Sequence, residues 1–524
     1  MKKLPISIQD FKELRTEGYL YVDKTALIYE LQSNHKVAFL ARPRRFGKSL
    51  LLSTLEYWFK GEKMLFEGLA IEQKPHPSPK PVIRIDFSSV ITEQGIRVFR
   101  RSVERKLREI ADCYAIDFPP DLIVEEYFDL LITRLYKATQ ERVVILIDEY
   151  DKPLVDNLGN SADKATFSKF LRSFFGTLKS QGTKIQFILF TGITKLANLS
   201  IFSVLNHVED ISLNPTYGSL LGITEEEIKR YFSEYIQAFG IKNEMAQEEV
   251  FTLIREWYNG YSWDGVQKVY NPFALLLFMK NLEVQSYWYE TGTPNLLVEQ
   301  IKKRKIAIPT LEQVEIETSH LLKGSLDTLS LPHLLFQTGY LTIKHKQTDT
   351  IPPIYTLGYP NKEVRMAFLE HLFHFIADSQ SHTLSPNIKN LKVALQNENF
   401  EQFLEIIRGV IAQISYNLHI PKESYYHSLF YIILGMMGLK MHPEVMTSRG
   451  RIDGVIELQN KVFIFEFKYG QKGADLGKLA QKAIKQIFDK GYLNRYKGIS
   501  SKLFVIGIGF HEKEIVGIIK RYQH

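Results

Sequence analysis

The 524-residue sequence contains a single cysteine, Cys113, and no uninterrupted apolar run long enough to cross a bilayer. A lone cysteine excludes an intramolecular disulfide and is typical of proteins in a reducing cytosol. The lysines near the N-terminus are not followed by an apolar segment, so we expect no signal peptide. The sequence also lacks internal repeats and low-complexity segments. These absences predict a cytoplasmic protein that has no membrane segment, and its length predicts two to four domains.

Charge is distributed unevenly along the chain. The net charge is +7, and residues 401–524 contain 18 lysines and arginines against 11 acidic residues, a difference of +7. The last quarter of the sequence therefore carries the whole excess. A basic terminal region is typical of proteins that bind a polyanion such as nucleic acid. A lysine-rich, solvated surface would have the same composition, and charge alone does not separate the two interpretations.

The first two hundred residues alternate short apolar runs with longer amphipathic stretches. The runs are "KVAFLA", "PVIRIDFS", "RVVILIDE" and "KIQFILFTG", which begin near residues 36, 81, 142 and 184. Strands that alternate with helices predict a parallel sheet in an α/β domain. Because the strands are apolar almost throughout, we expect helices on both faces of that sheet.

The remaining sequence changes character several times. A helix is expected after Thr224, which with Glu227 has capping-box spacing, and aromatic-rich helical sequence continues to about residue 300. Beyond residue 401 the pattern predicts helix, helix, strand, strand, helix and strand. We therefore expect an α/β core at 1–218, a helical lid at 219–300, a mixed connector at 301–400 and an α/β domain at 401–524.

The segment "RPRRFGKS" lies between the first apolar run and a helix. Gly47 lets the backbone approach a phosphate, Lys48 would reach the β- and γ-phosphates, and the Ser49 hydroxyl would ligate Mg²⁺. Arg42 stands where such loops usually begin with glycine, and a chance GKS tripeptide is the alternative interpretation. We assign nucleotide binding to the loop residues Arg42, Arg44, Arg45, Phe46, Gly47, Lys48 and Ser49.

Two acids end the third apolar run, in "ILIDEYDKP". Asp148 is placed to hold Mg²⁺, and Glu149 to orient or deprotonate an attacking water. Thr191, at the end of the next run, is a candidate sensor of the γ-phosphate, although a turn threonine is an equally fair interpretation. An ordinary strand end would also place two acids together, but their order and distance after "FGKS" favour a nucleotide site.

A second set of charged residues lies in "GRIDGVIELQNKVFIFEFKYG". A tight turn at Gln459–Asn460 would pair Leu458 with Lys461, and therefore Asp453 with Glu466. Residues two apart on a strand share a face, so Lys468 joins Glu466 while three phenylalanines pack on the other face. Two carboxylates and a lysine can hold Mg²⁺ or Mn²⁺ and stabilise a phosphodiester under attack.

Two further residues are candidates for the same site. Glu423 lies on an upstream helix, and Gln486 lies on the helix that follows the hairpin, where it would contact the scissile phosphate or the nucleic-acid backbone. A structural salt bridge between Lys468 and either carboxylate is the alternative, and a polar helix face is the alternative for Gln486. The combination of helix glutamate, hairpin aspartate and ExK in a basic domain favours catalysis.

Several motifs together resemble the bacterial AAA-ATPase-like family. They are "YVDKT", "RPRRFGKS", "LIDEYDKP", "TGITKLANLSIFSVLNHVEDIS", "WYNGYSW", "YNPFALL", "TGTP" and "QTGYLTI". "GRIDGVIE" and "FIFEFKYG" are similar to the PD-(D/E)XK nuclease domain that ends these proteins. The resemblance covers essentially the whole chain, and it implies an N-terminal P-loop NTPase sheet and a C-terminal restriction-endonuclease-like α/β domain. The family's arginine in place of the first P-loop glycine matches Arg42.

The resemblance also implies site residues and a function. It places a nucleotide site at Lys48, Ser49, Asp148 and Glu149, and a nuclease site at Asp453, Glu466, Lys468, Glu423 and Gln486. We expect an ATPase that regulates a metal-dependent nuclease acting on nucleic acid, DNA foremost, in defence against or control of foreign DNA. The alternative is a nucleotide-driven switch that binds nucleic acid or protein without cleaving. Self-association into a homo-oligomer stays open, because many relatives of this ATPase class form shared sites.

Overall fold

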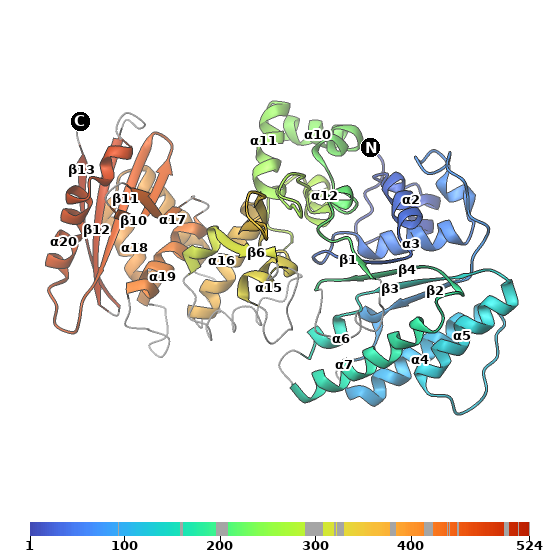
Figure 1. Ribbon diagram of the computed structural model, residues 1–524. Helices are drawn as coiled ribbons and strands as arrows, with labels where there is room; N and C mark the ends of the chain where they lie inside the picture. The colour runs from blue at the N-terminus through green and yellow to red at the C-terminus, as the bar shows by residue number, and fades with distance from the viewer. Residues whose placement is uncertain are drawn as a thin grey trace. The chain divides into compact units, whose positions relative to one another are not determined.

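The computed structural model describes most of the chain (Figure 1). It covers residues 1–524 except 93, 158–160, 195–207, 289–307, 319–320, 322–329, 378–383, 413–422, 438, 440, 448–449, 497–501, 512 and 523–524. Two compact units are present, Met1–Gly292 with Glu315–Asn361, and Thr293–Val314 with Lys362–His524. The stretch 301–400, which we predicted as a connector, is divided between these units. The exact limits of the four predicted segments stay predictions.

The first unit is built on a five-stranded parallel sheet with strand order β2-β3-β4-β1-β5. Its strands are β1 (Val37–Ala41), β2 (Val82–Asp86), β3 (Val143–Asp148), β4 (Ile185–Gly192) and β5 (Glu209–Asp210). The four strands predicted from apolar runs are confirmed. The two-residue strand β5 was not predicted, because two acidic residues carry no strand signal.

Helices cover both faces of this sheet, as the apolar strands require (Figure 1). On one face lie α2 (Thr25–Asn34) and α3 (Lys48–Phe59), and on the other lie α4 (Gly95–Cys113), α5 (Val124–Thr139) and α7 (Ser161–Gly176). All six residues of β3 are buried. A sheet enclosed in this way leaves its strand ends as the place where polar side chains can gather.

Helical sequence follows the sheet within the same unit. Its helices are α9 (Glu225–Tyr231), α10 (Ser233–Asn243), α11 (Gln247–Tyr258) and α12 (Pro272–Asn281). The predicted capping box begins α9, since Thr224 Oγ1 accepts a hydrogen bond from Glu227 N at 3.2 Å and the Glu227 carboxylate accepts one from Thr224 N at 2.8 Å. A three-stranded sheet of order β6-β8-β7 follows, with β6 (Val314–Glu317), α15 (Leu331–Thr338), β7 (Thr342–Gln347) and β8 (Ile354–Gly358).

The second unit contains a mixed sheet of order β13-β12-β11-β10-β9, in which β11 and β12 are parallel. Its elements are α16 (Lys362–Ala377), α17 (Leu384–Gln396), α18 (Phe400–Ala412), α19 (Glu423–Met436), β9 (Met441–Thr447), β10 (Gly450–Leu458), β11 (Lys461–Tyr469), α20 (Leu476–Asp489), β12 (Lys502–His511) and β13 (Glu514–Tyr522). The predicted order of helices and strands is confirmed, with the two edge strands β9 and β13 added. None of the helices in the described part of the chain is both long and apolar enough to cross a membrane.

Arg42 is buried at the start of the loop between β1 and α3. Its guanidinium donates hydrogen bonds to the carbonyl oxygens of Ala41, Ser212 and Tyr217, at 2.9, 2.8 and 3.1 Å. It also lies over the Trp263 ring, 3.9 Å from the centroid. The prediction that Arg42 contacts the nucleotide does not fit this placement, because the planar group is already held by three carbonyls and a ring. Arg42 instead fastens the loop to segments far away in the sequence.

This arrangement predicts that Arg42→Lys destabilises the first unit by about 2–4 kcal/mol, because a lysine cannot serve three carbonyls and stack on Trp263 at once. Urea unfolding followed by tryptophan fluorescence measures the change. The control is Arg101→Lys on α4, where the side chain is exposed and the expected cost is below about 0.5 kcal/mol. Equal stability of the two variants would contradict the assignment.

Candidate functional site

The first candidate site is formed where β1 turns into α3. Gly47 is the N-cap of α3 and has φ of +93°, a left-handed conformation that favours glycine. Arg45 also has positive φ, at +66°. The turn exposes backbone N–H groups at the start of a helix, where the helix dipole favours an anion. The strand, glycine turn and helix that the "FGKS" spacing predicted are present, and phosphate binding by this loop stays a prediction.

Lys48 lies inside this loop. Its ammonium donates hydrogen bonds to the carbonyl oxygens of Arg42 and Pro43, both at 3.1 Å, and its side chain is buried. Burial lowers the pKa of Lys48, while the nearby carboxylates of Glu149 and Asp148 act in the opposite direction. The side chain is therefore held as a fixed donor at the centre of the loop.

The acidic end of β3 lies beside the loop. Asp148 is 1% exposed and accepts a hydrogen bond from Thr191 Oγ1 at 2.5 Å, whereas its Oδ2 atom is buried without a hydrogen-bond partner in the described chain. Glu149 follows with φ of +48°, and burial raises its pKa above the usual range, with Asp148 adding to the effect. Thr191 thus contacts the candidate metal ligand Asp148.

Asp151 is a further acid at this strand end, and we did not predict its role. It is buried and accepts hydrogen bonds from Ile193 N, Thr194 N and Thr194 Oγ1, at 3.0, 2.7 and 2.8 Å. A Cβ atom at Gly192 would lie 2.7 Å from Asp151 Oδ1, so only glycine allows this approach. The last acid of the motif "DEYD" therefore holds the chain that follows the Thr191 strand.

A cavity of about 610 Å³ opens beside the loop. Its lining is rich in charge and includes Arg44, Arg45, Lys48, Ser49, Glu149 and Lys152. Arg45 lies 3.7 Å over the Phe273 ring, which connects the loop to α12. Arg42 does not line this cavity. Four cationic side chains around one cavity make it complementary to a polyphosphate.

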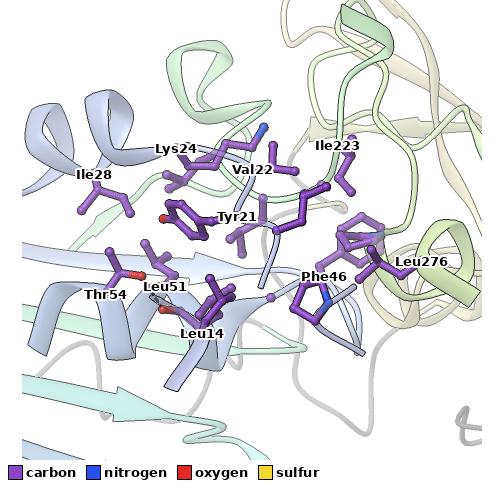
Figure 2. A pocket seen from close by; sticks show the side chains of 18 of the residues that line it. Leu14, Tyr21, Val22, Lys24, Ile28, Phe46, Leu51, Thr54, Ile223 and Leu276 are labelled. Atoms are coloured by element: carbon purple, nitrogen blue, oxygen red, sulfur yellow. Dashed lines mark hydrogen bonds between the residues drawn. The ribbon is translucent and has the colours of Figure 1, made fainter. Parts of the chain in front are cut away.

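A smaller, mostly apolar pocket of about 110 Å³ shares Gly47 and Leu50 with that cavity. Figure 2 shows Tyr21, Val22, Leu51, Ile223 and Leu276 around it, contributed by the "YVDKT" segment, α3 and the helical region. We did not predict this pocket, because its walls come from segments separated by some two hundred residues. The motif "YVDKT", which supplies part of the wall, is the sequence feature that could have indicated this pocket. Phe46 also lines the pocket, and its ring packs against Tyr261 at 4.8 Å.

The second candidate site lies on the hairpin of β10 and β11. The predicted register is confirmed from Leu458 opposite Lys461 to Gly454 opposite Phe465, and Gln459 in the turn has φ of +56°. Asp453 lies one residue beyond the last of these pairs. Its Oδ2 atom accepts a hydrogen bond from Phe467 N at 2.8 Å, which positions the carboxylate next to the ExK strand.

Glu466 is the most buried charged group of this site, at 1% exposed. Its Oε1 atom accepts hydrogen bonds from Lys468 Nζ, at 3.3 Å, and from the Gln486 amide. Its Oε2 atom is buried without a hydrogen-bond partner in the described chain. Burial, together with the Asp453 charge, raises the pKa of Glu466 to about 8. Glu466, Lys468 and Gln486 are thus brought together as predicted.

The opposite face of β11 anchors the strand. Phe465 packs against Phe403 of α18 at 6.4 Å, and Phe467 packs against Phe430 of α19 at 4.8 Å, measured between ring centroids. The expected alternation of packing phenylalanines and site residues is present. It fixes which face Glu466 and Lys468 occupy, because a shift by one residue would exchange the two faces.

Glu423 is the first residue of α19, and its side chain lies outside the described residues. Its place in the site therefore stays a prediction. Within the described residues, no group of three or more histidine, cysteine and acidic side chains is arranged to hold a metal ion. Any cation at either site would depend on one or two carboxylates and on ligands from substrate or water, which is usual for Mg²⁺.

Comparison with known proteins identifies two kinds of domain in this chain. Residues 5–202 match the AAA-ATPase-like family, described as a predicted AAA-ATPase, and residues 421–519 match the PD-(D/E)XK nuclease superfamily. The crystal structure of Cdc6p from Pyrobaculum aerophilum aligns with 71% of this chain and 95% of its own, at 11% identity and a TM-score of 0.22.

A relative of matching length establishes the family. The "Uncharacterized protein in vnfD 5'region" of Azotobacter chroococcum mcd 1 is 33% identical over 530 residues, which cover 99% of this chain and 98% of the relative. The chain therefore belongs to the same family as that protein, with an AAA-ATPase-like domain at its N-terminal end and a PD-(D/E)XK nuclease superfamily domain at its C-terminal end.

Proposed function

We propose that this chain is an ATPase that controls a metal-dependent nuclease within the same polypeptide. One observation supports both the ATPase part and the nuclease part of this proposal. Each half buries a strand carboxylate near a lysine and leaves one of its oxygens without a hydrogen bond in the described chain, Oδ2 of Asp148 and Oε2 of Glu466. A buried acceptor without a partner costs about 1–3 kcal/mol, and more if it is charged. A bound cation would offset that cost, so the donor sets fit divalent metal ions.

The cavity and the apolar pocket together suit ATP. The phosphates fit among Arg44, Arg45, Lys48 and Lys152 at the start of α3, and the base fits the adjoining apolar pocket, which contacts the same loop. Domains of the two kinds present here generally use a nucleotide and a divalent metal ion. Ser49 and Asp148 would hold Mg²⁺, which neutralises charge on the β- and γ-phosphates when bound.

Glu149 is the candidate general base for hydrolysis. Its pKa is raised by burial, and a base whose pKa lies closer to neutral accepts a proton from water more readily. Thr191 and Asp148 are joined by a hydrogen bond, which links the end of β3 to β4. Asp151, three residues after Asp148, binds the chain after Gly192.

At the second site Asp453 and Glu466 would hold Mg²⁺ or Mn²⁺, and the metal ion supplies a Lewis acid and an activated water when bound. Lys468 is positioned to stabilise negative charge on the phosphodiester, and Gln486 orients Glu466 through its amide hydrogen bond. DNA is the proposed substrate. An enzyme that cuts DNA only in one nucleotide state would suit the control of foreign DNA.

For the ATPase, Lys48→Ala is expected to weaken ATP binding more than tenfold, because the loop loses its fixed cation. Glu149→Gln is expected to keep binding and to lower turnover about 10²- to 10⁴-fold, the range for loss of a general base. Fluorescent-nucleotide binding and phosphate release measure the two effects. Lys137→Ala, an exposed lysine on α5, is the control. Turnover of Glu149→Gln equal to wild type would refute the role of Glu149.

For the nuclease, wild-type protein with ATP and Mg²⁺ or Mn²⁺ is expected to cut end-labelled DNA. Asp453→Ala and Lys468→Ala should each lower the cleavage rate at least about 100-fold, because the metal and the phosphodiester lose their ligands. Lys472→Ala, at an exposed position four residues further on, is the control. Cleavage unchanged in both site variants would overturn the site, and no cleavage by wild type under any condition would favour a binding switch.

The raised pKa of Glu466 predicts a pH-dependent stability. The native carboxyl titrates near pH 8 against 4.5 for the ordinary group, so the folded chain holds an extra proton between these values. Stability contributed by the neutral carboxyl is therefore lost as the pH rises from 4.5 to about 8, by at most about 1.4 kcal/mol per pH unit. Calorimetric unfolding of wild type and Glu466→Gln in EDTA at pH 5.5, 7 and 8.5 measures it. An identical pH trend in both proteins would contradict the prediction.

A further inference from the structure

Helix α20 has two distinguishable flanks. Its buried stripe of Ala480, Ala483, Ile484 and Ile487 faces the sheet. On one flank Gln486 donates a hydrogen bond to Glu466 of β11. On the other flank the ring of Phe488 lies 6.4 Å from that of Tyr522 on β13. These two contacts identify which side of the helix borders the carboxylate site and which side borders the edge of the sheet.

A row of lysines winds along α20 from the solvent-facing side of its first turns to the flank that borders the carboxylate site. Lys478, Lys482 and Lys490 are each separated from the next member of the row by four residues, with Gln486 as the member between the last two. Four residues advance about 6 Å along a helix and turn it by only about 40°, so such residues form one ridge. All three lysines are exposed. The ridge therefore presents ammonium groups on both sides of the glutamine that touches Glu466.

The charges on this ridge are largely uncompensated. Between Leu476 and Lys490 there are four lysines and one acid, Asp489. Lys478 has an exposed ion pair with Asp475 at 3.7 Å, and within the described residues Lys482 and Lys490 have no ion pair. The ridge lies in the region that carries the whole net charge of the protein. Exposed lysines at regular spacing complement a chain of phosphates.

We propose that the ridge formed by Lys478, Lys482 and Lys490 binds the phosphodiester backbone of a nucleic-acid strand and guides it past Glu466. The proposal rests on the nuclease function proposed above and adds the path of the substrate to it. A strand that follows the ridge reaches Gln486 between two phosphate contacts, so its backbone passes the carboxylates without any base being read. Binding through these lysines is consequently independent of sequence and depends strongly on salt.

The test measures binding of the full-length protein to a fluorescein-labelled 20-mer, as duplex DNA, single-stranded DNA and RNA of the same sequence. Ca²⁺ replaces Mg²⁺, and salt is varied from 50 to 200 mM. The ridge variant combines Lys478→Gln, Lys482→Gln and Lys490→Gln. The control removes the same charge from other elements of the second unit, α17 and β13, by Lys389→Gln, Lys520→Gln and Arg521→Gln, all at exposed positions. Circular dichroism confirms that both variants fold.

For whichever nucleic acid the wild type binds best, the ridge variant should lose at least tenfold in affinity at 100 mM salt. The slope of log affinity against log salt should fall by about 2–3, close to one for each phosphate contact removed, and the control should change much less. Equal losses of affinity in both variants would show that binding depends on general charge attraction and would overturn the proposal that the ridge is the binding surface. Unchanged binding by the ridge variant would overturn the ridge proposal and leave the proposed nuclease function standing. A wild type that binds none of the three probes would overturn the proposed action on nucleic acid itself.

Discussion

Two carboxylates buried near lysines are the constraint on which both candidate sites depend. Transfer of a charged carboxylate out of water is unfavourable unless it is paired, hydrogen-bonded or metal-bound. Asp148 and Glu466 are each about 1% exposed, and each has a buried oxygen without a hydrogen bond in the described chain. The other carboxylate oxygen of each acid accepts hydrogen bonds. Thr191 donates to Asp148, and Lys468 and Gln486 donate to Glu466. The elements around both acids serve to keep that geometry.

The two halves satisfy this constraint by different means. In the first unit the acid lies at the end of a parallel strand, and the loop beside it is held by Arg42, whose bonds reach Ser212 and Tyr217. In the second unit the acid lies within an antiparallel hairpin, and phenylalanines on the reverse face fix the strand. The first arrangement leaves a large cavity lined by charged side chains. The second leaves an acid whose charge depends on pH, because its pKa is raised to about 8.

Local patterns predicted much of this structure. Strands β1 to β4 were found because each is a short apolar run, and the hairpin register followed from one turn and the alternation of side chains. Other edge strands, β5 and β13 among them, were missed for a physical reason. β13 is mostly half-exposed and mixes apolar with basic residues, and β5 has only two residues, so neither shows the pattern of a buried strand. The capping box at Thr224 was predictable because it needs residues only three apart.

The sequence by itself determined which residue types could carry phosphate and metal chemistry, and for the hairpin it determined which of them face the same way. Tertiary structure decided the rest. Arg42 has a side chain of the kind that binds phosphate. It is buried, however, because carbonyl groups and a ring some 170 to 220 residues away in the chain surround it. The apolar pocket and the role of Asp151 likewise depend on segments that only folding brings together. Local spacing determines on which face of a strand or helix a side chain lies. Its burial and its bonding partners depend on contacts that no short stretch of sequence contains.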